Sequence, residues 1–175
     1  MKMPMLPQGK TGRLAAGGIF LALALLLSYL ENLFALFIPW LPGLKIGLAN
    51  VLITFLFFFV SEWEAAAVSF CRVLIMGLLF GSAISFLYSL GGAVLAFAGL
   101  FIAKKLGERI SFLGTSVICA CLHNIGQMTV AAGFFGVGVL NFYLPYLLLG
   151  GVFFGALTGL LLNFTAAKYK KVIDK

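Results

Sequence analysis

The chain has 175 residues and a net charge of +7 at pH 7, with 63% hydrophobic and only 10% charged residues. Its mean hydropathy of +1.15 lies far above that of water-soluble domains, which excludes a soluble globular protein. The positive charge does not indicate a nucleic-acid partner, because basic residues also set membrane topology and attract anionic lipid headgroups. We therefore expect an integral membrane protein that lies in a lipid bilayer and binds no nucleic acid.

Six apolar stretches follow one another along the chain, with short polar or Gly/Pro-rich breaks between them. They cover residues 14–30, 46–60, 64–81, 85–103, 115–137 and 142–167. About 20 apolar residues cross a hydrocarbon core as a helix, and lipid leaves no other partner for backbone polar groups. The stretches lack the alternation of a membrane β-barrel. The predicted fold class is an all-α integral membrane protein, with residues 1–175 forming a single transmembrane domain of about six helices in a compact bundle.

Lysine and arginine are distributed unevenly between the two sides of this bundle. With an even number of spans both termini share one side, which holds ten of the twelve basic residues: Lys2, Lys10, Arg13, Lys104, Lys105, Arg109, Lys168, Lys170, Lys171 and Lys175. The side richer in lysine and arginine faces the cytoplasm. We therefore expect a multi-pass plasma-membrane protein whose basic N-terminus (1–13) and basic tail (168–175) are both cytoplasmic.

Arg72 is the sharpest polar feature, because it lies near the middle of the third span. A charge at this depth costs at least ~2.5–3.5 kcal/mol on insertion scales, and no acidic residue lies at comparable depth. Two interpretations carry about equal weight. Arg72 either ties helices together through carbonyls and amides, or binds an anionic ligand in a cavity.

The fifth span contains a second polar group in the sequence CLHNIGQ (121–127). His123 and Gln127 are four residues apart and share one helical face, with Asn124 beside them. A single histidine is usually a core residue with its hydrogen bonds satisfied. Three polar side chains in five residues of a membrane helix favour a water-containing pocket, since each side chain needs a hydrogen-bond partner.

The segment PWLPGLKIGLAN (39–50) connects the first two spans on the side of the membrane opposite the termini. Such a Pro/Gly-rich element is tolerated where protein or a water-filled cavity covers its backbone. We expect a loop that folds over a ligand site, with Trp40 as an aromatic wall, Lys45 as a cation and Asn50 as a hydrogen-bonding group. The alternative is an interfacial belt of Trp and Lys. Tyr88 and Tyr143 are further candidates for the flat face of a ligand.

Small residues three or four apart mark where membrane helices can approach closely. Gly77 and Gly81, and likewise Gly151, Gly155 and Gly159, are expected to pack helices within the bundle. Ala15, Gly18 and Ala22 in the first span form a smooth strip that a partner membrane protein could grip.

Catalytic motifs are not found. The chain has five acidic residues, and it lacks an aspartate-rich motif for magnesium diphosphate, a nucleophile elbow and a phosphate-binding glycine loop. Cys119 and Cys121 are two apart on a helix and point to different faces, so they do not form a metal site. We expect no enzyme activity, no cofactor and no metal.

Four motifs carry a resemblance to a known family: YLENLFALFIPWLPGLKIGLANV (29–51), FCRVLIMGLLFGS (70–82), FLYSLGGA (86–93) and HNIGQ (123–127). The chain resembles the small bacterial membrane proteins labelled heptaprenyl diphosphate synthase component I, or Gx transporter family. That family looks like the substrate-binding S components of energy-coupling factor (ECF) transporters. The resemblance implies six helices, a lid at residues 39–45, and docking of Ala15, Gly18 and Ala22 on a transmembrane coupling subunit that works with ATPase subunits. Glycine at position 18 departs from the usual alanine-x-x-x-alanine form.

The main hypothesis is therefore an S component that captures a small anionic vitamin or cofactor precursor without chemical change. The ligand-binding candidates are Trp40, Lys45, Asn50, Arg72, Tyr88, His123, Asn124, Gln127 and Tyr143. The alternative from the family label is a noncatalytic membrane component of a heptaprenyl diphosphate synthase. A scaffold without a ligand is the third possibility.

Overall fold

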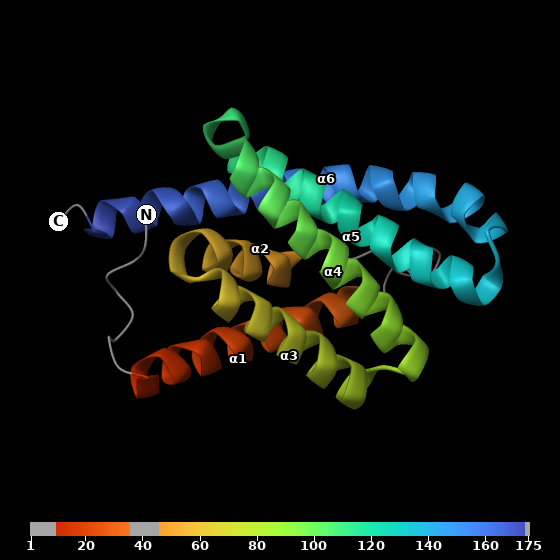
Figure 1. The fold of residues 1–175 in the computed structure, drawn as a ribbon, viewed down its shortest axis with the longest axis horizontal. Coiled ribbons are helices and arrows are strands. Elements are labelled where there is room, and N and C mark those ends of the chain that lie inside the picture. The colour runs from red at the N-terminus through yellow and green to blue at the C-terminus, as the bar shows by residue number, and fades with distance from the viewer. Residues whose placement is uncertain (1–9, 36–45, 174–175) are drawn as a thin grey trace.

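The computed structural model describes residues 10–35 and 46–173. In this part of the chain the elements are α1 (Lys10–Ala35), α2 (Leu48–Phe55), the π-helical turn η1 (Leu56–Val60), α3 (Glu62–Phe80), α4 (Ala83–Leu106), the 3₁₀ turn η2 (Gly107–Arg109), α5 (Phe112–Phe135) and α6 (Gly138–Ile173) (Figure 1). The described residues contain no strand. The predicted all-α fold with about six helices is confirmed.

The helices pack in a continuous series, with α2 enclosed by the others. α5 lies between α4 and α6, while α3 packs against both α4 and α1. α2 contacts α1, α3 and α6, and its side chains form a core with those of its neighbours: Ala24, Ile53, Leu56, Phe57, Ala65, Val68, Leu100 and Cys119. α1 begins and α6 ends at the same end of the bundle (Figure 1). We call this the terminal end, and the other the far end.

Five of the helices are long and apolar enough to span a membrane. These spans are Thr11–Phe34, Glu62–Phe80, Ala83–Arg109, Phe112–Phe135 and Leu140–Lys168. The length and hydrophobicity of these helices are those of a multi-pass membrane protein. The predicted spans of 14–30, 64–81, 85–103, 115–137 and 142–167 correspond to them.

The second predicted span, 46–60, is corrected by the structure. α2 and η1 together cover residues Leu48–Val60, which reach only ~20 Å at 1.5 Å per residue. α2 starts inside the bundle, since a methyl group placed on Gly47 would lie 3.9 Å from Cγ2 of Thr158 on α6. Gly47 has a left-handed backbone conformation with a φ of 86°, which residues other than glycine rarely adopt. This turn sets the unusual starting depth of α2.

Glycines allow α5 to approach both of its neighbours closely. A methyl group placed on Gly126 would lie 2.3 Å from the carbonyl oxygen of Gly91 on α4. On the other side, methyl groups on Gly155 and Gly159 would lie 2.8 and 2.5 Å from Cα atoms of α5. The glycine stripe of the last span therefore packs helices within the bundle, as predicted.

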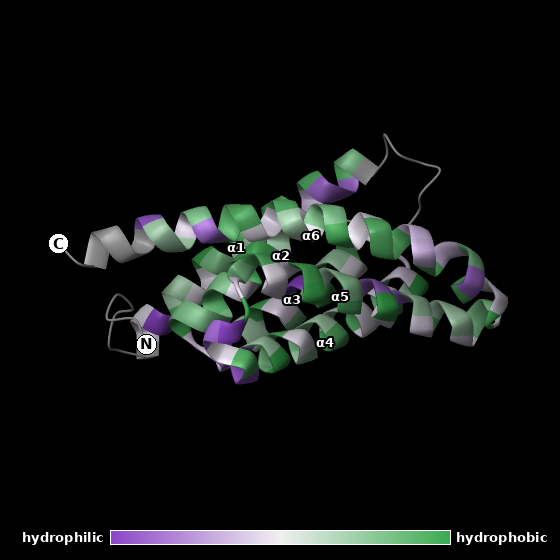
Figure 2. Ribbon diagram, turned by 90° about the horizontal axis from the view of Figure 1, so that it is seen from above, coloured by the Kyte–Doolittle hydropathy of each residue, from purple (hydrophilic) through white to green (hydrophobic). Residues whose placement is uncertain are grey.

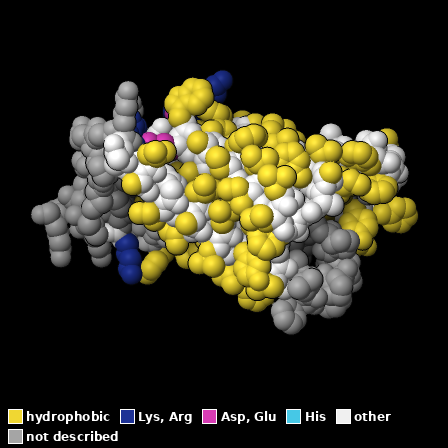
Figure 3. All heavy atoms as spheres, turned by 90° about the horizontal axis from the view of Figure 1, so that it is seen from below, with side chains coloured by type: hydrophobic (Ala, Val, Ile, Leu, Met, Phe, Trp, Pro, Cys, Tyr) yellow, Lys and Arg dark blue, Asp and Glu magenta, His cyan; other side chains and the backbone are white. Residues whose placement is uncertain are grey.

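Charged side chains gather at the terminal end. Arg13 Nε lies 3.2 Å from Glu64 Oε1, and Lys104 forms an ion pair with Glu62, so α3 is linked there to α1 and α4. Hydrophilic ribbon segments are frequent at this end, and a few also lie among the helices (Figure 2). The face drawn in Figure 3 is mainly hydrophobic, with its charged side chains near the terminal end. This pattern agrees with the clustering of basic residues on one side.

Candidate functional site: a polar cavity around Arg72

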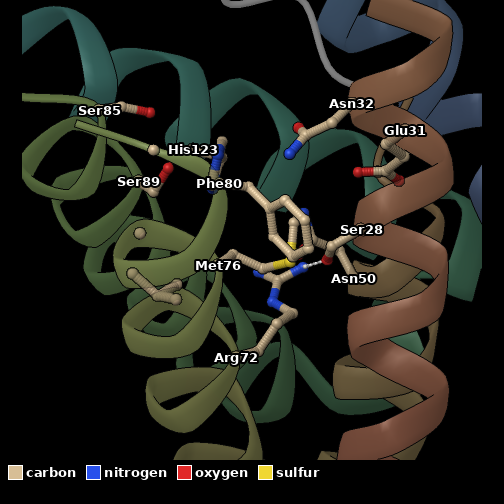
Figure 4. A pocket seen from close by; sticks show the side chains of 14 residues that line it. Ser28, Glu31, Asn32, Asn50, Arg72, Met76, Phe80, Ser85, Ser89 and His123 are labelled. Atoms are coloured by element: carbon tan, nitrogen blue, oxygen red, sulfur yellow. Dashed lines mark hydrogen bonds between the residues drawn. The ribbon is translucent and has the colours of Figure 1, made fainter.

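A polar cavity of about 100 Å³ lies among α1, α2, α3, α4 and α5. Its polar lining comprises Ser28, Glu31, Asn32, Asn50, Arg72, Ser85, Ser89 and His123. The last turns of α1 and α3 and the first turns of α4 contribute to its walls, so the cavity is at the far end of the bundle (Figures 1 and 4). We call it the Arg72 cavity.

Arg72 reaches from α3 toward α1 and α2, and its side chain is buried with 8% exposure. Nη1 donates to Ser28 Oγ at 3.5 Å, and Nη2 donates to Asn50 Oδ1 at 3.2 Å. Both acceptors are uncharged, while the carboxylate of Glu31 lines the same cavity and interacts electrostatically with the guanidinium. A guanidinium carries five N–H donors, so these two bonds leave donors for a further acceptor.

Glu31 fixes the start of α2. Its Oε1 accepts a hydrogen bond of 3.3 Å from the backbone N–H of Ala49, and the residue is 7% exposed. A carboxylate at a helix N-terminus is stabilised by the free N–H groups and the helix dipole. Glu31 thus joins α1 to α2 across residues 36–45, and it lines the cavity together with Arg72.

His123 and Asn50 separate the Arg72 cavity from a second, smaller one. Together with Gly47 they line both, and the second cavity of about 30 Å³ continues between α2, α5 and α6. This volume is enough for a water molecule, and the walls include hydroxyl and amide groups. The two cavities make a polar interior that extends from the far end toward the middle of the bundle.

Asn124 faces the smaller cavity but is held by α6. Its Nδ2 donates to the backbone oxygen of Leu147 at 2.6 Å. Adjacent residues of the CLHNIGQ segment therefore have different roles: His123 lines the Arg72 cavity, and Asn124 joins α5 to α6. Of the predicted ligand-binding residues, the structure brings Asn50, Arg72 and His123 together around one cavity.

Three other predicted residues lie away from the cavity. Gln127 packs against Gly92 of α4, where a methyl group would meet its Cγ at 2.9 Å. Tyr88 and Tyr143 belong to an apolar cluster around Met128, Ala131 and Leu147. The buried Gln127 Oε1 and Tyr88 Oη have no hydrogen-bond partner among the described residues. None of the three lines the Arg72 cavity.

Trp40 and Lys45, with the predicted lid at residues 39–45, lie outside the described residues. The predicted docking residues Ala15, Gly18 and Ala22, which we call the α1 strip, are described and are all exposed along α1. A methyl group on Gly18 would meet no atom within 4 Å. This surface is therefore open in the isolated chain.

Sequence reasoning missed several serines of the cavity. Ser28 lies three residues before Glu31 and four before Asn32, and Ser85 and Ser89 are four apart, so each set shares a helical face. This spacing could have indicated that the serines line a polar site. It was weak because serine is common in membrane helices, where its hydroxyl can bond the carbonyl four residues earlier.

Comparisons with known proteins bear on the family of the chain. No curated protein and no solved structure matches it. A family described as heptaprenyl diphosphate synthase component I matches residues 20–165, which include every residue that lines the Arg72 cavity. Because the match covers most of the chain, this protein belongs to the heptaprenyl diphosphate synthase component I family.

Proposed function

We propose that this protein is a noncatalytic membrane subunit that binds a small anionic molecule in the Arg72 cavity and takes part in its uptake. In this proposal it works as an S component in a bacterial plasma membrane, with the terminal end cytoplasmic and the far end outside. The observation that carries the proposal is a buried guanidinium beside a cavity, whose two hydrogen bonds to Ser28 and Asn50 leave further N–H donors although Glu31 lines the same cavity.

The energetics of Arg72 favour a binding role. Burying an arginine in a membrane is costly, and hydrogen bonds to one hydroxyl and one amide, with Glu31 in the same cavity, compensate part of that cost. A carboxylate or phosphate group would accept bidentate, charge-assisted bonds, which are roughly twice as strong as neutral ones. The nearby Ser85 and Ser89 add hydroxyl groups to the same walls. These donors suit an oxyanion.

The size of the cavity suggests how a ligand would lie. About 100 Å³ accommodates an acidic head group but not a whole vitamin-sized molecule. The remainder would lie toward the mouth, where Phe80 lines the cavity and its ring centroid lies 5.3 Å from that of Tyr29. Phe80, rather than Tyr88 and Tyr143, would then contact a flat part of the ligand.

The proposed transport step follows from the position of α2. Glu31 ties its first turn to α1, and both helices line the cavity, so a shift of α2 relative to α1 would change the shape of the cavity. Closure over the ligand would be followed by docking of the α1 strip on a coupling subunit driven by ATPase subunits. Such lids and population shifts are common in ligand capture.

Ligand binding is tested by analysing small molecules that remain bound after growth in rich medium and purification in detergent. Native mass spectrometry should detect an acidic compound bound once per chain, and Arg72→Met should lose it. The matched control is Arg13→Met, which removes an exposed arginine at the terminal end. Circular dichroism in detergent should first show that both variants keep the helical content of the wild type. Equal retention by both variants would refute the role of Arg72.

Partner docking is tested by two glycine substitutions on α1. Neither Gly17 nor Gly18 has an atom within 4 Å of an added methyl group, so leucine should be tolerated at both. The two residues point about 100° apart on the helix. Gly18→Leu should reduce co-purification of the coupling and ATPase subunits, whereas Gly17→Leu should not. Equal effects would contradict docking through the α1 strip.

A second candidate function rests on the description of the family. In it, the chain is a noncatalytic membrane component of a heptaprenyl diphosphate synthase. Co-expression with a soluble catalytic subunit should then raise prenyl transfer by that subunit. If the rate is unchanged while both proteins are present and folded, this candidate is removed.

A further inference from the structure

A second large space lies at the terminal end, on the opposite side of the bundle from the Arg72 cavity. It measures about 570 Å³, which falls within the range of small-molecule sites. Its walls come from η1, the end of α4, η2, the start of α5 and α6. We call it the basic-end crevice, and none of its lining residues is shared with the Arg72 cavity.

The lining of the crevice is amphipathic. Phe58, Ala103, Ile110 and Phe112 supply apolar walls. Polar groups come from Lys104, Glu108, Ser111, Thr115 and Asn163. Water does not fill a space between apolar walls favourably, whereas a hydrocarbon chain does. The walls therefore fit a molecule with an apolar part and a polar head.

The basic residues at the rim of the crevice favour a negatively charged head group. Lys104 lines the crevice and pairs with Glu62, and the neighbouring Lys105 and Arg109 are exposed, so three basic side chains stand against the two acids Glu62 and Glu108 in this region. α5 begins beside them, with Ser111 capping its N-terminus through a 3.1 Å bond from the N–H of Gly114. Basic side chains and a helix N-terminus both attract anions.

The location agrees with a membrane amphiphile. Trp63 is 85% exposed at the start of α3, which Glu62 and Glu64 place at the terminal end through their ion pairs with Lys104 and Arg13. Exposed tryptophan with charged neighbours is typical of the depth at which headgroups meet acyl chains. Asn163, exposed on α6, adds an amide to the same rim.

We propose that the basic-end crevice binds one anionic amphiphile, with its phosphate near Lys104 and its hydrocarbon chain against Phe58 and Phe112. The proposal does not depend on the ligand or transport role assigned to the Arg72 cavity. A phospholipid and an isoprenoid phosphate share this chemistry, and the experiment below separates them.

The test is a native mass spectrometric titration of delipidated protein in detergent. The probes are phosphatidylglycerol, phosphatidylcholine with the same chains, and geranylgeranyl diphosphate. Lys104→Gln removes a rim charge, and its matched control is Lys105→Gln, which makes the same change at a residue that does not line the crevice. Asn163→Trp places a large side chain in the crevice from an exposed position.

We expect one tightly bound phosphatidylglycerol or geranylgeranyl diphosphate per chain and weaker binding of phosphatidylcholine. Lys104→Gln should weaken binding of the anionic probes about fivefold, while Lys105→Gln should change it much less. Asn163→Trp should abolish the tight site and leave the melting temperature close to that of the wild type. Whichever of the two anionic probes binds more tightly shows whether the natural ligand is a phospholipid or an isoprenoid phosphate. Equal binding of phosphatidylcholine, or unchanged tight binding by Asn163→Trp, would overturn the proposal.

Discussion

Gly126→Ala should separate α4 from α5 and displace His123 from the wall of the Arg72 cavity. The added methyl group would lie 2.3 Å from the Gly91 carbonyl oxygen, and real Cβ atoms essentially never approach closer than 3.0 Å. The obstacle is backbone, so the two helices must move apart by at least about 0.7 Å. Overpacking of this kind costs ~1–3 kcal/mol. For a chain of this size each kcal/mol lowers the melting temperature by ~2–4 °C.

The matched control for this change is Gly133→Ala, near the end of the same helix, where a methyl group would meet no atom within 4 Å. It should be neutral or gain up to ~1 kcal/mol, because alanine favours the helix over glycine. Thermal unfolding in detergent, followed by circular dichroism, compares the two variants. If Gly126→Ala melts at the same temperature as Gly133→Ala, the close α4–α5 contact described above is wrong.

Three further substitutions test local features by the same unfolding assay. Ser111→Ala removes the N-terminal cap of α5 and should cost ~1 kcal/mol, and an unchanged melting temperature would show that the cap contributes nothing. Asn124→Leu breaks the buried bond to the Leu147 carbonyl and should cost ~1–3 kcal/mol, whereas a neutral result would mean that this bond does not join α5 to α6. Glu64→Gln breaks the exposed ion pair with Arg13 and should cost less than ~1 kcal/mol; a larger loss would place this pair in a less solvated setting than its exposure indicates.

Hydrophobicity and length were enough to predict five of the helices, because a membrane span must be long, apolar and fully hydrogen-bonded. The exception was α2, where composition indicated a span but the chain enters the bundle at Gly47, well inside it. The sequence 39–50 did signal an interruption at this place. The depth at which α2 begins depends on contacts with α1 and α6, which hydropathy does not encode.

The site was predictable where a residue type is costly in a membrane. Arg72 and His123 stood out for that reason, and the structure brings both to one cavity with Asn50. Tyr88 and Tyr143 were selected for their aromatic rings, but such rings also fill apolar clusters, and that is where both lie. A ring alone does not distinguish a ligand wall from a core.

The basic-end crevice was not anticipated. Its residues come from five elements and are individually ordinary, so only the packing of η1 against the α4–α5 turn and α6 reveals the space. The basic residues of this region were interpreted as topology signals and as a general attraction to anionic lipid headgroups, without a defined binding site. That interpretation and a lipid site are compatible, because both place the terminal end at an anionic membrane surface.

The most direct test of the central claim, that the Arg72 cavity binds small anions, is thermal stabilisation by a panel of small carboxylates and phosphates at constant ionic strength. A ligand that binds the folded state at 100 times its dissociation constant stabilises it by ~2.7 kcal/mol. We expect at least one compound to raise the melting temperature of the wild type and of Arg13→Met, but not of Arg72→Met. If every stabilising compound acts equally on Arg72→Met, or if none stabilises the wild type, the cavity is not an anion site and Arg72 serves to join α1, α2 and α3.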